Sequence, residues 1–274
     1  MKVALLDGYN LMHRARFGMR QGDAHIVFNF FRSLRPIVEE IDPDVVYLVL
    51  EGVPMHRVQL DAEYKANRVI EPGTPQADEM AEFRRQKRII LSALENFPFK
   101  VAKHDTLECD DTIASLCIDV HADDECVVVS TDTDFIQLLR PGGNVRLYNP
   151  VKKEYVDPVE YDYVTWKALR GDKTDNITRV DGMTDGKALK VLSDTAKLDA
   201  VRKDPTLGPQ FERNLTLVRF KTGDQHNINI TQGRADLDTA RATFRDLKFF
   251  SMVNDTAWKN YTKTFRRLLE SQGA

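Results

Sequence analysis

Short apolar segments that alternate with a helical pattern constrain the fold of this chain most strongly. Four runs have the length and composition of strands: KVALLD (2–7), VVYLVLE (45–51), ECVVVST (125–131) and VRLYN (145–149). The run IVFNFFRSLRPIVEEI (26–41) has helical periodicity, and the pattern beyond residue 158 is mainly helical. This alternation predicts an α/β fold with a mostly parallel central sheet flanked by helices on both faces.

A charged segment from about residue 57 to residue 88 follows the second of these strands. It contains YKANR (64–68), the turn signal EPGTP (71–75) and the start of a helical run, 76–97. The stretch RRQK (84–87) fits either a solvated helix face or contact with phosphate groups, and the pattern leaves both open.

The composition is that of an ordinary globular chain, with 274 residues, 42% of them hydrophobic and 30% charged. Its apolar runs are too short to span a membrane and its N-terminus lacks a signal-peptide pattern, so we expect a cytoplasmic protein with no membrane partner. The three cysteines show no metal-type pairing, which indicates reduced thiols, and the six scattered histidines disfavour zinc.

Acidic residues lie where the expected strands end. Asp7 closes the first strand, Glu51 closes the second, and Asp132 and Asp134 follow the third. In open parallel sheets, ligands collect in the crevice beyond the carboxyl ends of the strands. These four side chains are therefore candidates for one site.

Two further acidic groups have the same character. The motif ECDD places Glu108, Asp110 and Asp111 before an apolar helix, and GDKTDNI places Asp172 and Asp175 after the amphipathic run YVTWKALR. Each acid, taken alone, also fits a helix cap, a turn or a solvated surface.

The nine acids taken together predict a metal site. Nine unscreened carboxylates in one crevice would repel one another and raise each other's pKa values. Oxygen ligands without histidine suit Mg²⁺ or Mn²⁺, and two such ions about 4 Å apart can activate water and clamp a phosphodiester. Without the nine acids the net charge of −3 becomes about +6, which makes a nucleic-acid partner plausible.

The chain resembles the family of 5′-3′ exonucleases and flap endonucleases, which includes bacteriophage 5′ nucleases and the N-terminal 5′ nuclease domain of bacterial DNA polymerase I. The similarity covers nearly the whole chain. The motifs that carry it, in the family's order, are LLDGYNLMHR, LEGVPMHR, YKANR, LECDDTIAS, STDTDFIQLL and GDKTDNI.

The resemblance implies a PIN-like nuclease core at residues 1–160, with a helical arch at about 57–105 beneath which a single-stranded 5′ end is threaded. It implies a helical C-terminal region, 161–274, with a helix-three-turn-helix motif that binds duplex DNA. The activity it implies is that of a structure-specific 5′ nuclease, an exonuclease or flap endonuclease that hydrolyses DNA by a two-metal mechanism.

It also implies roles for individual residues. Lys65 and Arg68, three apart on an expected helix, are the catalytic cations that stabilise charge at the scissile phosphate. The cofactor is Mg²⁺, two or more ions, with Mn²⁺ as a substitute. The metal ligands are Asp7, Glu51, Glu108, Asp110, Asp111, Asp132, Asp134, Asp172 and Asp175, and the DNA-binding residues are Arg14, Arg57, Tyr64 and Lys187, with Tyr64 as a surface for base stacking.

The chain departs from the family pattern at two places. Glu51 stands where the family usually has aspartate, and its longer side chain shifts the carboxylate by roughly 1 to 1.5 Å, so it is either an adapted metal ligand or a strand-end acid held by Arg57. In VDGMTDGKAL (180–189), Thr184 replaces the second glycine of the family's turn, and a side chain there can obstruct the approach of backbone amides to duplex phosphates.

Two alternative functions stay open from the sequence. One is a related ribonuclease that acts on RNA or RNA-DNA hybrids, and the other is a catalytically silent DNA-structure-binding protein. The clustered acids argue against the second, because binding alone gains nothing from negative charge near phosphates. A functional link to a separate DNA polymerase or single-strand-binding protein is left open, and a bacterial or bacteriophage-infected cell is the expected setting.

Overall fold

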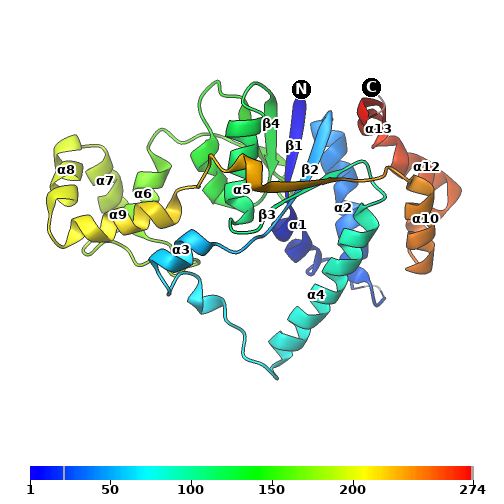
Figure 1. Cartoon of the computed structure of the whole chain (residues 1–274), viewed down its shortest axis with the longest axis horizontal. Helices are drawn as coiled ribbons and strands as arrows, with labels where there is room; N and C mark the ends of the chain where they lie inside the picture. The colour runs from blue at the N-terminus through cyan, green and yellow to red at the C-terminus, as the bar shows by residue number, and fades with distance from the viewer. Residues whose placement is uncertain (21, 273–274) are drawn as a thin grey trace.

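A seven-stranded sheet runs through the middle of the molecule in the computed structural model, which describes residues 1–20 and 22–272 (Figure 1). Its order is β6 (Glu154–Val156), β5 (Val145–Asn149), β4 (Glu125–Val129), β1 (Lys2–Asp7), β2 (Val45–Leu50), β3 (Lys100–His104) and β7 (Ile228–Gln232). The five inner strands are parallel, and β6 and β7 are antiparallel edges. The predicted α/β fold with a mostly parallel sheet is confirmed.

Helices cover both faces of this sheet, because the central strands β1, β2 and β4 are apolar and buried on both sides. The helices are α1 (Gly8–Ala15), α2 (His25–Ile41), α3 (Met55–Leu60), α4 (Pro75–Leu94), α5 (Cys109–Ser115), α6 (Tyr163–Arg170), α7 (Asp185–Leu192), α8 (Thr195–Lys203), α9 (Leu207–Val218), α10 (Leu237–Asp246), α11 (Phe250–Val253), α12 (Asp255–Lys263) and α13 (Arg266–Gln272). One core packs the sheet against α2, α4 and α10–α13, and a second packs it against α5 and the short helix Thr133–Leu138.

The region expected to be one helical C-terminal part divides in space. Helices α6–α9 have a separate core, built around Leu169, Met183 and Phe211, at one end of the molecule. Strand β7 joins the central sheet, and α10–α13 pack at the opposite end, where Phe244 and Phe265 enter the main core (Figure 1). The boundary at residue 160 and the helix-three-turn-helix motif stay predictions.

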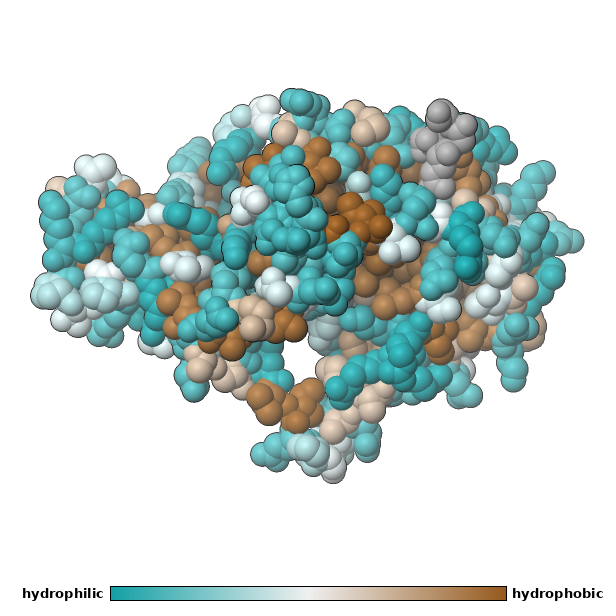
Figure 2. Space-filling model, viewed as in Figure 1, coloured by the Kyte–Doolittle hydropathy of each residue, from teal (hydrophilic) through white to brown (hydrophobic). Residues whose placement is uncertain are grey.

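The charged segment forms a projection below the sheet, residues 61–94, which corresponds to the expected arch (Figure 1). Helix α4 descends to a tip, and the chain from residue 61 to residue 74 connects that tip to α3 (Figure 1). Figure 2 shows an opening through the molecule between this projection and the body. YKANR is not an α-helix, because Lys65 is left-handed (φ 55°) and only a 3₁₀ turn, Ala66–Arg68, follows. Within the described residues, no helix is long and apolar enough to cross a membrane.

Candidate metal-dependent active site

Seven of the nine predicted metal ligands line one cavity of about 240 Å³ beyond the carboxyl ends of β1, β2 and β4. The sheet order places β1 between β2 and β4, so the strand connections diverge there and leave a crevice. The acids of the cavity are Asp7, Glu51, Asp110, Asp132, Asp134, Asp172 and Asp175, and its cations are Lys65, Arg68, Lys167 and Arg170.

Local hydrogen bonds fix the carboxylates that follow the strands. Asp7 caps α1 and accepts hydrogen bonds from the Asn10 backbone N–H (3.0 Å) and from the Ser130 hydroxyl (2.8 Å). Glu51 accepts one from the backbone N–H of Cys109 at the start of α5 (3.1 Å). Each acid is thus positioned by a neighbouring element.

A tight loop after α6 presents Asp172 and Asp175. Asp172 and Ile177 exchange backbone hydrogen bonds of 2.9 and 2.7 Å, which closes the loop. Gly171 begins it at φ 71°, and a Cβ there would lie 2.5 Å from the Ile177 carbonyl oxygen, so only glycine fits. Asp172, Asp175 and Asp134 offer carboxylate oxygens that lie within 4.8 Å of one another.

Burial makes these carboxylates costly to ionise without a cation. Burial, more than any other cause, raises the pKa of Asp7 to about 6, of Glu51 to about 7 and of Asp134 to about 6. Glu108 adds to the effect at Glu51, and Asp132 adds to it at Asp7. Burial also raises the pKa of Asp110 well above its usual range.

The donor set fits a hard divalent cation. The acidic donors are all carboxylates, and no histidine or cysteine among the described residues lines the cavity. Oxygen-only ligands suit Mg²⁺ or Mn²⁺ and disfavour softer metals. Asp134, Asp172 and Asp175 lie close enough together that they could hold one ion, and Asp7, Glu51, Asp110 and Asp132 line the rest of the same cavity.

Two predicted catalytic cations reach the cavity from the projection. The Lys65 ammonium pairs with Glu108 (2.5 Å) and lies 3.7 Å from Asp175, and Arg68 pairs with Asp175 (2.5 Å). The Lys65 backbone N–H also donates to the Asp175 carbonyl oxygen (3.0 Å). The projection and the Asp172–Asp175 loop are therefore held together at the cavity.

The structure does not bring Glu108 and Asp111 to the cavity. Both Asp111 oxygens bind the Arg57 guanidinium (2.5 and 2.8 Å), and Asp111 is completely buried. Glu108 accepts hydrogen bonds from Arg57 (2.9 Å) and from the Tyr64 hydroxyl (2.8 Å) as well as from Lys65. These two acids form a buried network beside the site, which differs from the expectation that they hold metal.

Two expected DNA-binding residues belong to the same network. Arg57 is 2% exposed and Tyr64 is 6% exposed, so neither side chain can meet DNA as expected. The Tyr64 ring packs with Ile177, Leu217 and Val218 and offers no free face for a base. Arg57 was considered as a partner of Glu51, but it binds Glu108 and Asp111 instead.

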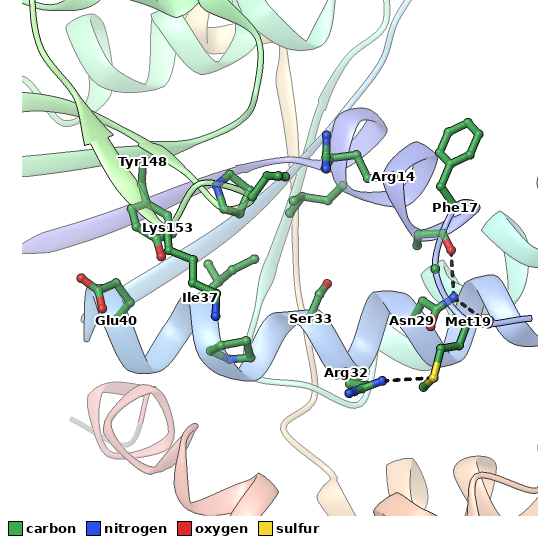
Figure 3. Close-up of a pocket in the computed structure, with 16 residues that line it drawn as sticks. Arg14, Phe17, Met19, Asn29, Arg32, Ser33, Ile37, Glu40, Tyr148 and Lys153 are labelled. Carbon is green, nitrogen blue, oxygen red and sulfur yellow. Dashed lines mark hydrogen bonds between the residues drawn. The ribbon is translucent and has the colours of Figure 1, made fainter.

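The other two expected DNA-binding residues lie outside the cavity. Arg14 lines a separate cavity of about 720 Å³ along α2, with Lys153 on another wall (Figure 3). Lys187 is exposed on α7 and donates to the Gly182 carbonyl oxygen (3.0 Å). Their contact with DNA stays a prediction.

Sequence reasoning missed Lys167, which pairs with Asp134 and, at 2.7 Å, with Asp172. The signal was a lysine on the otherwise buried face of the run YVTWKALR. It also missed Tyr9, which lines the cavity and stacks on His13 with ring centroids 5.8 Å apart. Tyr9 follows Asp7 by two residues, and this closeness to a predicted metal ligand could have pointed to it.

Comparisons with known proteins agree on one family. Residues 2–167 match the family model described as 5′-3′ exonuclease, N-terminal resolvase-like domain. The thermostable DNA polymerase I of Thermus filiformis is 26% identical over 284 residues, which cover 93% of this chain and 33% of the polymerase. A 5′-3′ exonuclease of Mycobacterium tuberculosis is 27% identical over 230 residues, 73% of this chain and 72% of that protein.

Among solved structures, bacteriophage T5 D15 flap endonuclease, in a pseudo-enzyme-product complex with DNA and metal ions, has a TM-score of 0.66. It is 18% identical, and the match covers 100% of both chains. At this identity the likeness concerns the fold. The chain spans about a third of the length of the Thermus polymerase that it matches.

Proposed function

This chain belongs to the 5′-3′ exonuclease family, and on that premise we propose that it is a structure-specific 5′ nuclease that hydrolyses DNA phosphodiesters with divalent cations. The observation that carries the proposal is the convergence of seven carboxylates in one cavity, which Lys65 and Arg68 of the projection also line. A catalytically silent DNA-binding protein would have no use for so many buried acids beside a phosphate path.

The cofactor we propose is Mg²⁺, with Mn²⁺ as a substitute. Asp134, Asp172 and Asp175 would hold one ion, and Asp7, Glu51, Asp110 and Asp132 would hold a second. When bound, such ions offset the repulsion between the carboxylates and stabilise negative charge during in-line displacement at phosphorus.

Lys65 and Arg68 supply the protein's own positive charge at the scissile phosphate. Burial disfavours the Lys65 ammonium, but Glu108 and Asp175 outweigh it and raise its pKa, so the side chain stays charged. Both cations stand at the cavity before any substrate arrives, and such preorganised charge costs no reorganisation during the reaction. Lys167 holds Asp134 and Asp172 in place from the opposite side.

The substrate we propose is DNA with a 5′ end or flap, threaded through the opening under the arch formed by residues 61–94. Helices α6–α9 would hold the adjacent duplex, with Lys187 and the turn at 180–189 toward its phosphates. A DNA polymerase is a proposed functional partner, because DNA polymerase I proteins are among the relatives that this chain resembles in sequence.

A gel assay with 5′-labelled flap DNA and a matched RNA flap tests this proposal. We expect Mg²⁺-dependent release of short 5′ products from the DNA substrate and no cleavage in the presence of a chelator. Preferential cleavage of the RNA flap would indicate the ribonuclease alternative. Binding of both substrates without cleavage at any Mg²⁺ or Mn²⁺ concentration would contradict the proposal.

A further inference from the structure

A second cavity of about 600 Å³ lies where α3 meets α9 and the chain that follows it, and we call it the α3–α9 pocket. Two arginines, one lysine and one glutamate line it. Among the described residues, none of these three cations forms a salt bridge. The lining comprises His56, Arg202, Glu212, Leu215, Thr216, Arg219, Phe220, Lys221 and Thr222.

The segment after α9 supplies two of the cations. Arg219 and Lys221 both line the pocket, and both residues are exposed. The Phe220 ring between them packs against Phe135, with 5.6 Å between the ring centroids. The Lys221 backbone N–H donates to buried Asp111 (2.8 Å), which anchors this segment.

His56 adds an unsatisfied hydrogen-bonding group to the pocket. Both ring nitrogens are buried, and neither has a hydrogen-bond partner among the described residues. A buried polar group without a partner is costly, so a ligand that gives the ring a hydrogen bond is favoured. Arg57, the next residue, points inward to Glu108 and Asp111, whereas His56 lines the pocket and would present a ring nitrogen to a ligand there by turning its ring.

The combination of charges and donors matches a phosphate group. Arginine offers a planar fork of N–H donors to phosphate oxygens, lysine offers a compact charge, and a neutral imidazole offers one N–H. We propose that the α3–α9 pocket binds a phosphate group of the nucleic acid, on the 5′ single strand beyond the cleavage site. The pocket's chemistry stands on its own, and only the choice of strand rests on the proposed function.

The position of the pocket favours that strand. Helix α3 ends at Leu60, and the arch begins at Asp61, whose carboxylate lies 3.7 Å from Arg213 of α9. The pocket is therefore built on the junction that holds the base of the arch. Figure 1 shows α3 at this base, so the pocket lies beside the root of the arch, next to the path we propose for the single strand.

The test uses the double variant Arg219→Gln with Lys221→Gln. Its matched control is Arg245→Gln with Lys259→Gln, which removes the same charge from exposed positions on α10 and α12. Fluorescence anisotropy in a chelator measures the binding of substrates with a one-nucleotide flap or with a flap of about ten nucleotides. Because no cleavage is needed, failure of the proposed function would not disturb this measurement.

We expect the double variant to bind the long flap about tenfold more weakly and the short flap normally. Its slope of log affinity against log salt should become shallower by about 0.7 for the long flap, since the contact with one phosphate is lost. The control should behave as wild type.

A second experiment separates a phosphate group of the nucleic acid from a free phosphate ion as the ligand. Wild type and double variant are titrated with inorganic phosphate, and the NMR signals of the His56 ring are followed. Shifts that need Arg219 and Lys221, without any effect of flap length, would assign the pocket to a free phosphate. If flap length has no effect on binding and phosphate causes no shift of the His56 signals, the proposal is overturned.

Discussion

Lys65 is the residue whose role the geometry defines most closely, because its ammonium stands between Glu108 and the cavity acid Asp175. Lys65→Ala should lower the single-turnover rate by about 100-fold, roughly 3 kcal/mol, with a smaller change in DNA affinity. Lys259→Ala is the matched control, since it removes the same charge from an exposed position on α12, outside the cavity. A defect in affinity alone would reduce Lys65 to a binding residue.

Replacing Glu51 by glutamine should weaken the use of Mg²⁺ and raise the stability of the metal-free protein. Glu51→Gln should raise the Mg²⁺ concentration needed for half-maximal activity, because an amide is a poorer ligand for a hard cation, and Mn²⁺ should partly restore activity. In a chelator the same variant should melt at a higher temperature, since it removes a buried charge.

Mg²⁺ titrations and melting curves of wild type, Glu51→Gln and the exposed control Glu63→Gln check this prediction. An unchanged Mg²⁺ curve together with a lower melting temperature would remove Glu51 from the metal site.

The residue-scale predictions succeeded where a residue's position along the chain decides its place. Acids at the ends of parallel strands must lie at one edge of the sheet, so Asp7, Glu51 and Asp132 came together as expected. The direction of a side chain on a short helix depends on packing partners far away in sequence. Arg57 turned inward because Asp111 and the Leu217 carbonyl oxygen receive it, and no local pattern reveals that.

At the scale of elements, the Arg57 network ties α3 to α5 and α9. Arg57→Ala would leave Asp111 buried without its partner, and breaking a buried pair in this way costs about 3 to 5 kcal/mol. We expect a large fall in melting temperature, whereas Arg84→Ala, at an exposed position on α4, should change stability by about 0.5 kcal/mol or less. Normal stability with weakened DNA binding would restore the sequence-based role of Arg57.

Strands β1, β2 and β4 were predictable from sequence because they are apolar and buried on both faces, and β5 was found from the run VRLYN although Arg146 in it is exposed. Strand β3 was missed because KVAKH carries lysines at Lys100 and Lys103 and only two apolar residues between them. Strand β7 was missed because its pairing with β3 joins segments more than 120 residues apart, and its own residues are mostly exposed. Tertiary context, not local propensity, decides such strands.

At the scale of the whole molecule, the sequence could not divide the helical C-terminal region. The amphipathic patterns of α6–α9 and α10–α13 are alike, but one set encloses its own core and the other packs on the sheet. Periodicity identifies an apolar helix face and does not identify its partner. The arch, by contrast, was expected from the resemblance, and its charged segment does project from the body (Figure 1).

The buried acids make the stability of the metal-free protein depend on pH. Asp7, Glu51 and Asp134 have pKa values of about 6, 7 and 6 in the folded state, above those of an unfolded chain. The folded protein therefore holds protons that the unfolded chain has released, so its stabilisation is complete below about pH 4 and is lost as pH rises through 6 to 7.

In a chelator, we expect the melting temperature to fall by on the order of 5 to 10 °C between pH 5 and pH 8. Mg²⁺ should remove most of this fall, because it binds the ionised carboxylates and stabilises the folded state. A melting temperature that rises over the same range in chelator would contradict the placement of these acids in one uncompensated cavity.

The most direct test of the account is single-turnover cleavage of a 5′ flap substrate by Asp134→Asn in Mg²⁺, with DNA binding measured in parallel. Asp134 belongs to the closest group of carboxylates, with Asp172 and Asp175. The account predicts that cleavage disappears while DNA binding is unchanged or tighter, because a metal ligand and a negative charge near phosphate are lost together. The exposed control Asp199→Asn should cleave as wild type does. Full cleavage by Asp134→Asn in Mg²⁺ would contradict the account.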